Sequence, residues 1–155
     1  MSQLGRFDES YADPATGRPR RNASVTLYRE GATVSGNQSG TSPLAITVRH
    51  RGKIAASDTV FIGTDTATTY SVNSVTATTI TISGFVGTLN VSNGDRITPS
   101  NSQPTLYSDD QGGATTGNPL TSTSLGAASC YMLTGAYDFT VLNGATTTAF
   151  TGLVT

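Results

Sequence analysis

Residues Pro104–Leu142, PTLYSDDQGGATTGNPLTSTSLGAASCYMLTGAYDFTVL, decide the fold class of this chain. Near the end of this stretch Tyr137, Phe139 and Val141 alternate with Asp138 and Thr140. Period-two alternation between segments rich in Gly, Pro, Asn and Asp indicates half-buried antiparallel strands joined by tight turns. We therefore expect one sheet face to be formed by the three apolar residues. The expected strands are 104–107, 128–133 and one from Tyr137, with turns at 109–113, 118–119 and Gly135.

Composition also favours strands. Ser and Thr together supply 45 of the 155 residues, and only 12% of the residues are charged. Thr is β-branched and fits the solvated face of a strand, so an all-β protein is favoured over a helical one. The apolar content of 35% predicts a thin core, and such cores often gain stability by oligomerising.

The middle of the chain carries further strand patterns. In the segment that starts at Pro43, residues Leu44, Ile46 and Val48 share one face. Four or five short strands fit within residues 51–100, which suits a small barrel or a compact sandwich. The run from Gly31 to Ser42 is rich in Gly, Ser, Asn and Gln and is interpreted as a long turn or linker. The clearest strands of 51–100 are 59–62, 78–83 with Ile80 and Ile82 in phase, and 95–98.

The order of turns and aromatic strands in Pro104–Leu142 resembles a module found in structural proteins of tailed bacteriophages, among neck, tail-fibre and head-decoration components. In that module an aromatic strand, a D-x-G turn, an N-P-L-T segment, a Gly before a short aromatic strand, and G-x-Y-D-x-x-V follow one another. The resemblance covers about a third of the chain and implies a β-sandwich, immunoglobulin-like or transthyretin-like, in a virion particle. The matching residues are Leu106, Tyr107, Asp109, Asp110, Gly112, Asn118, Pro119, Leu120, Thr121, Gly126, Tyr131, Gly135, Tyr137, Asp138, Phe139 and Val141.

The segment Tyr11–Gly31, YADPATGRPRRNASVTLYREG, looks like the usual opening of such modules, a D-x-x-T-G-x-P turn before a V-T-L-Y strand. In related modules a short loop joins that strand to the P-T-L-Y strand, whereas here 75 residues separate Tyr28 from Pro104. We therefore expect a discontinuous sandwich, residues 23–44 and 103–155, with an inserted small β-barrel subdomain at 45–102. Loop tips tolerate such insertions. Two tandem domains meeting near 103 are the alternative.

Residues 1–22 show neither a helical nor a strand period, and we interpret them as an extended N-terminal arm that lies across a neighbouring subunit. Arg and aromatic residues are enriched at protein interfaces. A disordered tail is the alternative, since termini are commonly disordered. The candidate docking residues of the arm are Phe7, Tyr11, Arg18, Arg20 and Arg21.

Charge is distributed unevenly along the chain. Residues 1–53 hold eight of the nine Lys and Arg against four acids, and residues 54–155 hold one Arg against six Asp. The two halves thus carry about +4 and −5, which predicts docking of the basic half onto an acidic neighbouring protein, with a solvated basic face as the alternative. The net charge of −1 argues against nucleic-acid binding, which needs a strong basic excess.

Catalytic and metal chemistry has few candidates. His50 is the single histidine and Cys130 the single cysteine, so neither a catalytic triad nor a histidine-rich or cysteine-rich metal site is expected. Oxygen ligands for calcium are available at Asp109, Asp110 and Asp65, but Asp and Gly are also what a β-turn needs, and no calcium-loop motif is present. We expect no enzyme activity and no cofactor.

No apolar run approaches the roughly 20 residues of a membrane span, and the N-terminus lacks an apolar signal region. We therefore expect a soluble protein that is made in the host cytoplasm and located in the virion.

The predicted function is that of a non-enzymatic structural component of a tailed-phage virion, placed in head decoration, at the neck or collar, or as an adaptor of the tail or a fibre. Its expected partners are other virion proteins and itself, as a homotrimer or ring. The alternative is a carbohydrate-binding module that contacts host surface glycans through exposed tyrosines. The candidate tyrosines are Tyr28, Tyr70, Tyr107, Tyr131 and Tyr137, for which core packing is the simpler interpretation.

Overall fold

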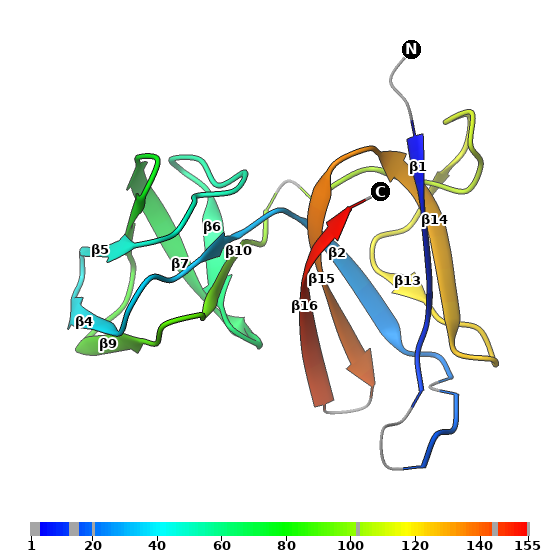
Figure 1. Cartoon of the computed structure of the whole chain (residues 1–155), viewed down its shortest axis with the longest axis horizontal. Coiled ribbons are helices and arrows are strands. Elements are labelled where there is room, and N and C mark those ends of the chain that lie inside the picture. Colours follow the sequence, from blue (N-terminus) through cyan, green and yellow to red (C-terminus); the bar gives the residue numbers. More distant parts are fainter. Residues whose placement is uncertain (1–3, 13–15, 20, 102, 144–145, 155) are drawn as a thin grey trace. The chain divides into compact units, whose positions relative to one another are not determined.

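The computed structural model describes residues 4–12, 16–19, 21–101, 103–143 and 146–154, with side chains as far as Leu142 (Figure 1). Over these ranges the chain forms strands and no helix, so the predicted all-β class is confirmed. The chain divides into two compact units. We call them the sandwich unit, Met1–Leu27 with Pro104–Thr155, and the barrel unit, Tyr28–Gln103.

The sandwich unit has two four-stranded sheets, in agreement with the predicted β-sandwich. Sheet A has the strand order β1-β14-β11-β12, and sheet C has the order β13-β2-β15-β16. The pairs β1–β14, β11–β14, β11–β12, β13–β2 and β15–β16 are antiparallel. The strands are β1 (Leu4–Ser10), β2 (Ser24–Arg29), β11 (Leu106–Tyr107), β12 (Thr115–Thr116), β13 (Leu120–Thr121), β14 (Ala127–Leu133), β15 (Ala136–Asn143) and β16 (Thr146–Val154).

The core of the sandwich unit draws on both sheets. The expected face of β15 is confirmed, because Phe139 and Val141 are buried and Tyr137 packs against the same core. Asp138 and Thr140, on the opposite face of β15, are nevertheless also buried, at 2% and 5% exposed. The buried residues are Phe7, Ala23, Val25, Leu27, Leu106, Leu120, Ala128, Cys130, Met132, Phe139 and Val141.

The Asn118–Pro119 corner predicted from the sequence extends the pairing between β13 and β2 in sheet C. The Asn118 side chain accepts a hydrogen bond from the Leu27 N–H (3.1 Å) and donates one to the Leu27 carbonyl (2.8 Å). In the register Leu120 pairs with Val25, so Asn118 stands opposite Leu27 and continues the β13–β2 ladder with its amide. The peptide bond between Asn118 and Pro119 is cis.

The prediction of an extended arm over residues 1–22 is wrong for the part that the structure describes. Residues 4–10 form β1, which pairs with β14 along its whole length, from Leu4 opposite Leu133 to Ser10 opposite Ala127. The sequence of β1 carries a single large apolar residue at its centre, Phe7, and that residue is 1% exposed. Because Phe7 packs on Phe139 and stands opposite Cys130, both more than a hundred residues away, the local sequence gave no strand signal. Residues 1–3, 13–15 and 20 lie outside the described ranges.

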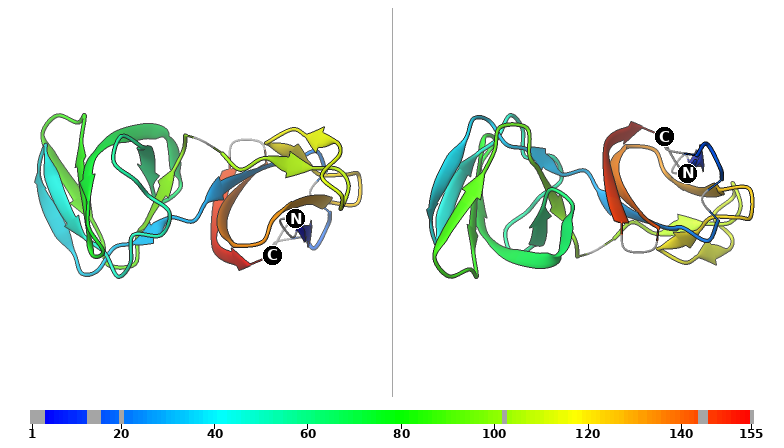
Figure 2. Two further views of the ribbon diagram at one scale, coloured as in Figure 1. Left: turned by 90° about the horizontal axis from the view of Figure 1, so that it is seen from above. Right: turned by 90° about the horizontal axis from the view of Figure 1, so that it is seen from below.

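The barrel unit is built on a six-stranded sheet of order β3-β10-β6-β7-β8-β5. Its first and last strands continue into a bridge between Val34 and Val48, flanked by backbone hydrogen bonds from Ser35 N to Thr47 O and from Arg49 N to Thr33 O, both 2.9 Å. This bridge closes the sheet on itself, and the curl is visible in Figure 2. The strands are β3 (Ala32–Thr33), β5 (Leu44–Thr47), β6 (Thr59–Ile62), β7 (Asp65–Val75), β8 (Thr79–Ser83) and β10 (Arg96–Pro99); β4 (Gln38–Thr41) and β9 (Thr88–Val91) pair separately.

The interior of the barrel unit is filled by small and β-branched side chains. The predicted faces are confirmed for Ile46 with Val48 and for Ile80 with Ile82, all of which are buried. Leu44, expected on the same face, is half-buried at the margin of this core. The buried cluster consists of Ala32, Val34, Ile46, Val48, Ile54, Val60, Val72, Ile80, Ile82, Val91 and Ile97.

The boundaries of the inserted unit differ from those expected. The barrel unit begins at Tyr28, not at 45, because Ala32 pairs with Ile97 and Val34 packs inside the barrel. The segment Gly31–Ser42, interpreted as a linker, contains β3 and β4. Conversely, the sandwich unit takes residues 1–27, so the predicted division of 1–22 from 23–44 does not follow the packing. In the sequence, Tyr28–Gln103 lies between the two segments of the sandwich unit.

The predicted basic and acidic halves are not regions of the folded chain. Residues assigned to the sandwich unit include four Arg and six acids, whereas the barrel unit has five Lys and Arg and four acids. The units therefore carry about −2 and +1 in place of +4 and −5. The sandwich unit combines a basic N-terminal segment with an acidic C-terminal segment, because the chain leaves this unit after Leu27 and returns to it at Pro104.

Candidate functional site

The residues proposed for the docking arm divide into core and surface positions. The Phe7 ring packs edge to face on Phe139, with centroids 5.6 Å apart, and the Tyr11 ring lies 6.5 Å from the same residue. Burial, and to a lesser extent the charge of Glu9, raises the pKa of Tyr11 above its ordinary value. Both aromatic residues therefore stabilise this chain's own core and are not anchors for a neighbour. Arg18 and Arg21 are exposed, and Arg20 lies outside the described residues.

The outer face of sheet A brings together residues from four strands. Arg6 on β1 pairs with Tyr131 on β14. Tyr131 also pairs with Tyr107 on β11, and Tyr107 pairs in turn with Thr115 on β12. Because directly opposed residues in a sheet share a face, these four side chains form one row across it. The neighbours of Tyr131 along β14, Cys130 and Met132, are buried, so the row faces away from the core.

Apolar and charged groups flank this row. On one side Leu4 pairs with Leu133, which is 50% exposed, and on the other Asp8 pairs with Ser129. Arg6 Nη2 lies 3.1 Å from Asp8 Oδ2, an exposed ion pair that contributes little to stability. We call this set, Leu4, Arg6, Asp8, Tyr107, Thr115, Ser129, Tyr131 and Leu133, the outer face of sheet A.

A turn ordered by Asp109 lies over one end of the outer face of sheet A. Asp109 accepts hydrogen bonds from the backbone N–H groups of Gln111 (3.0 Å), Gly113 (3.0 Å) and Ala114 (2.8 Å). These bonds, chiefly those from Gly113 and Ala114, hold the pKa of the Asp109 carboxyl below its usual value. A Cβ placed on Gly112 would be 3.5 Å from Leu4 Cδ1 and 3.7 Å from Tyr107 Cε1. The turn therefore packs on the tyrosine and fixes its position.

The five candidate tyrosines have different surroundings. Tyr28 is buried and packs edge to face on Phe61 (5.1 Å between centroids), and Tyr70 packs in the same way on Phe85 (5.8 Å). The Tyr137 hydroxyl donates a 2.7 Å hydrogen bond to the Leu133 carbonyl, and burial raises its pKa. Core packing is thus the right interpretation for Tyr28 and Tyr137. Tyr107 and Tyr131 remain half-exposed and adjacent.

A polar groove in the barrel unit is lined by Asn37, Gln38, Ser39, Asn90, Val91 and Ser92, and amide side chains in it and beside it form hydrogen bonds within the fold. Gln38 accepts from Thr47 N (2.8 Å) and donates to Thr47 O (2.9 Å), replacing a strand pair. Asn37 accepts from Asn93 N (2.8 Å), and Asn93 accepts from Gly36 N (3.0 Å). This groove is therefore best explained as turn structure.

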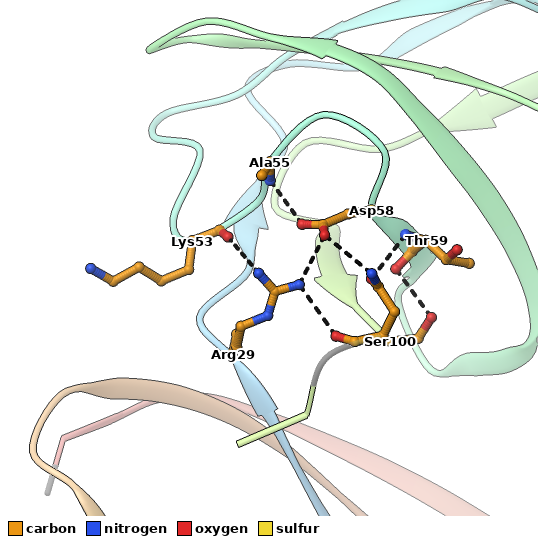
Figure 3. Close-up of polar contacts among 7 residues, drawn as sticks. Arg29, Lys53, Ala55, Asp58, Thr59 and Ser100 are labelled. Carbon is orange, nitrogen blue, oxygen red and sulfur yellow. Dashed lines mark hydrogen bonds and ion pairs between the residues drawn. The ribbon is translucent and has the colours of Figure 1, made fainter. Parts of the chain in front are cut away.

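A polar cluster in the barrel unit escaped the sequence analysis (Figure 3). The Arg29 guanidinium lies 3.0 Å from the buried Asp58 carboxylate and donates to the carbonyls of Lys53 and Asn101, both at 3.2 Å. Asp58 also accepts from Ala55 N (2.8 Å) and from the Asn101 amide (3.2 Å). Arg29 lies where the chain enters the barrel unit and Asn101 where it leaves, so the cluster ties these two segments together. We assign it a structural role.

The single cysteine and the single histidine of the chain belong to different units. Cys130 is buried in the sandwich core, and burial raises the pKa of its thiol to about 11, so the thiol is protonated at neutral pH. His50 is exposed in the barrel unit, between Arg49 and Arg51.

The aspartates considered as calcium ligands serve as turn acceptors. Asp65 Oδ1 accepts from Ala67 N and Thr68 N, both at 3.2 Å, and hydrogen bonds to Thr68 lower the pKa of Asp65. Within the described ranges no three His, Cys, Asp or Glu side chains are close enough together to hold a metal ion. In the same ranges no helix has the length and apolarity to cross a membrane.

Comparison with protein-family models, with curated proteins and with solved structures finds no match to this chain.

Proposed function

We propose that this protein is a non-enzymatic structural component of a tailed-bacteriophage virion and acts by docking onto other virion proteins. The observation that carries the proposal is the outer face of sheet A, where two tyrosines, an arginine and two leucines from β1, β11 and β14 lie together. Tyr and Arg are the residues most enriched in the parts of interfaces that contribute binding energy. The phage-like motif supports the assignment, because Tyr107, Tyr131 and the Asp109–Gly112 turn belong both to the motif and to this face.

The proposed location is head decoration, the neck or collar, or an adaptor of the tail or a fibre. The sandwich unit would be the docking module and the barrel unit an addition carried by it. Arg18 and Arg21, which are exposed, are further polar contacts available to a partner.

The test is incorporation into particles. Phage particles in which this protein carries Tyr107→Ala and Tyr131→Ala should contain at least tenfold less of it than wild-type particles, by quantitative mass spectrometry. The matched control is Tyr70→Ala, which removes a half-buried tyrosine of the barrel unit and should leave incorporation unchanged. Purified particles that contain no wild-type protein would disprove the virion assignment, and equal incorporation of all variants would disprove the docking face.

A second candidate function is binding of host surface glycans, favoured by the adjacent Tyr107 and Tyr131 side chains on one sheet face with Arg6, Asp8 and Thr115 beside them. Aromatic rings stack on the apolar faces of sugars while polar groups bind the hydroxyls. This function predicts millimolar to micromolar affinity on a glycan array that Tyr131→Ala abolishes and Tyr70→Ala preserves. An array without any signal for the wild-type protein would contradict it.

A further inference from the structure

The sheets of the two units differ in how their edges end. A strand at the edge of a sheet presents unpaired N–H and C=O groups, which invite pairing with another chain unless the edge is protected. The main sheet of the barrel unit is closed by the bridge between Val34 and Val48. The sandwich unit ends on four edge strands, β1 and β12 in sheet A and β13 and β16 in sheet C.

Three of these four edges are protected by length or by charge. Strands β12 and β13 are two residues long, too short to template a ladder. Strand β1 is seven residues long, but Arg6, Asp8 and Glu9 lie along it. Short edge strands and charged side chains on edge strands are both means by which natural sheets avoid edge-to-edge association.

The fourth edge, β16, has no such protection. It spans Thr146–Val154, TTTAFTGLV, nine residues without a charge or a proline. At roughly 3.3 Å per residue the strand presents about 30 Å of backbone. Within the described part of the chain it is paired on one side only, with β15. Its composition, rich in Thr with Phe, Leu and Val, is that of segments that pair readily as strands.

We propose that the free edge of β16 pairs with β16 of a second copy of this chain, antiparallel about a two-fold axis, so that sheet C continues into an eight-stranded sheet across the dimer. An antiparallel pair of identical strands is self-complementary, since each residue i opposite j implies j opposite i. Because β16 carries no charge, its twin meets no like-charge repulsion, whereas a charged partner strand would gain no counter-ion from it. Self-complementarity and the absence of charge therefore favour a second copy of this chain as the partner that pairs with the edge of β16.

The proposed dimer specifies the self-assembly expected of a virion protein and in that respect rests on the proposed function. It can be tested on the purified protein, without phage particles. The pairing is isologous and closes after two copies, so it predicts a dimer and not the trimer or ring expected from the sequence. Its failure is distinguishable from failure of the virion assignment, which is tested by particle composition.

The experiment is light scattering over a concentration series with two matched variants. Thr147 on β16 pairs with Leu142 on β15, and Leu142 is 43% exposed, so a lysine at either position extends the same row of the sheet. Thr147→Lys puts the charge on the edge and should weaken the dimer at least tenfold. Leu142→Lys puts it one strand inward and should change the dissociation constant less than threefold.

Hydrogen exchange of the wild-type protein provides a readout that needs no variant. Alternate β16 amides should exchange faster when the protein is diluted below the dissociation constant, while amides of β1 should not change. A monomer at every concentration, a trimer, equal effects of the two lysines, or concentration-dependent protection confined to other strands would each overturn the proposal.

Discussion

The two units have cores of about equal size built from different side chains. The buried cluster inside the barrel consists of Val, Ile and Ala, with Phe61 and Tyr28 buried outside that cluster, whereas the sandwich core includes Phe7, Phe139, Met132 and three leucines. A small closed barrel has an interior just wide enough for compact side chains, and β-branched residues fill it with little loss of rotamer freedom. Two sheets packed face to face lie about 10 Å apart and need longer side chains to fill the gap.

The difference extends to the backbone. The main barrel sheet closes on itself through the bridge between Val34 and Val48, whereas each sheet of the sandwich unit ends on two edge strands. The proposed docking face and the proposed pairing edge both belong to the sandwich unit. The three predictions below test this comparison.

The largest effect is expected from Phe7→Ala, which removes the central side chain of β1. Phe7 is 1% exposed and packs on Phe139, so its loss should lower the free energy of unfolding of the sandwich unit by about 3–5 kcal/mol. Scanning calorimetry should show the sandwich transition moving to lower temperature with the barrel transition in place. The converse control is Ile97→Ala in the barrel core. Equal loss in both transitions would show that the units unfold as one.

A smaller effect is expected from Gly52→Ala in the barrel unit. Gly52 has φ +58°, and a Cβ there would overlap the Gly31 carbonyl oxygen and lie 2.6 Å from that of Glu30. Positive φ costs an L-residue roughly 1–2 kcal/mol, and overpacking against backbone adds about 1–3 kcal/mol. Gly63→Ala isolates the first cost, because Gly63 has φ +64° with nothing within 4 Å. Denaturant unfolding that gives equal losses for the two variants would contradict the close backbone approach at Gly52.

The smallest effect concerns the Asp109 turn of the sandwich unit. Because the folded-state pKa of Asp109 lies below its unfolded value, the turn is stabilised above the unfolded pKa of about 3.8, and this contribution is lost as the pH falls through the folded pKa. NMR titration of the Gly113 and Ala114 amide protons should give a midpoint below 3.8. Asp109→Asn should remove that titration, and a midpoint at or above 3.8 in the wild-type protein would refute the assigned hydrogen bonds.

Local sequence patterns were sufficient for the class of the fold and for the faces of several strands. Period-two alternation identified the Phe139 and Val141 face of β15 and the Ile80 and Ile82 face of β8. The corner at Asn118–Pro119 followed from turn chemistry, which depends on neighbouring residues alone. These features are determined by interactions within a few residues, and so the sequence carries them directly.

The interpretation failed where the partners of a residue lie far along the chain. Strand β1 has one buried aromatic and looked like an arm, and Gly31–Ser42 looked like a linker although β3 and β4 lie within it. In the Arg29 cluster, the ion pair joins Arg29 to Asp58 across 29 positions and the amide of Asn101 lies 43 positions beyond Asp58. The alternation of apolar and polar residues within a strand contains no information on such distant polar pairs.

The sequence by itself therefore determined that this chain is all-β and which side chains of its regular strands point inward. Only the tertiary structure decided that β1 belongs to the sandwich, that the barrel sheet closes at Val34 and Val48, and that Arg6, Tyr131, Tyr107 and Thr115 form one row. The physical reason is that strand alternation is a property of each strand, whereas register between distant strands is set by the packing of the whole core.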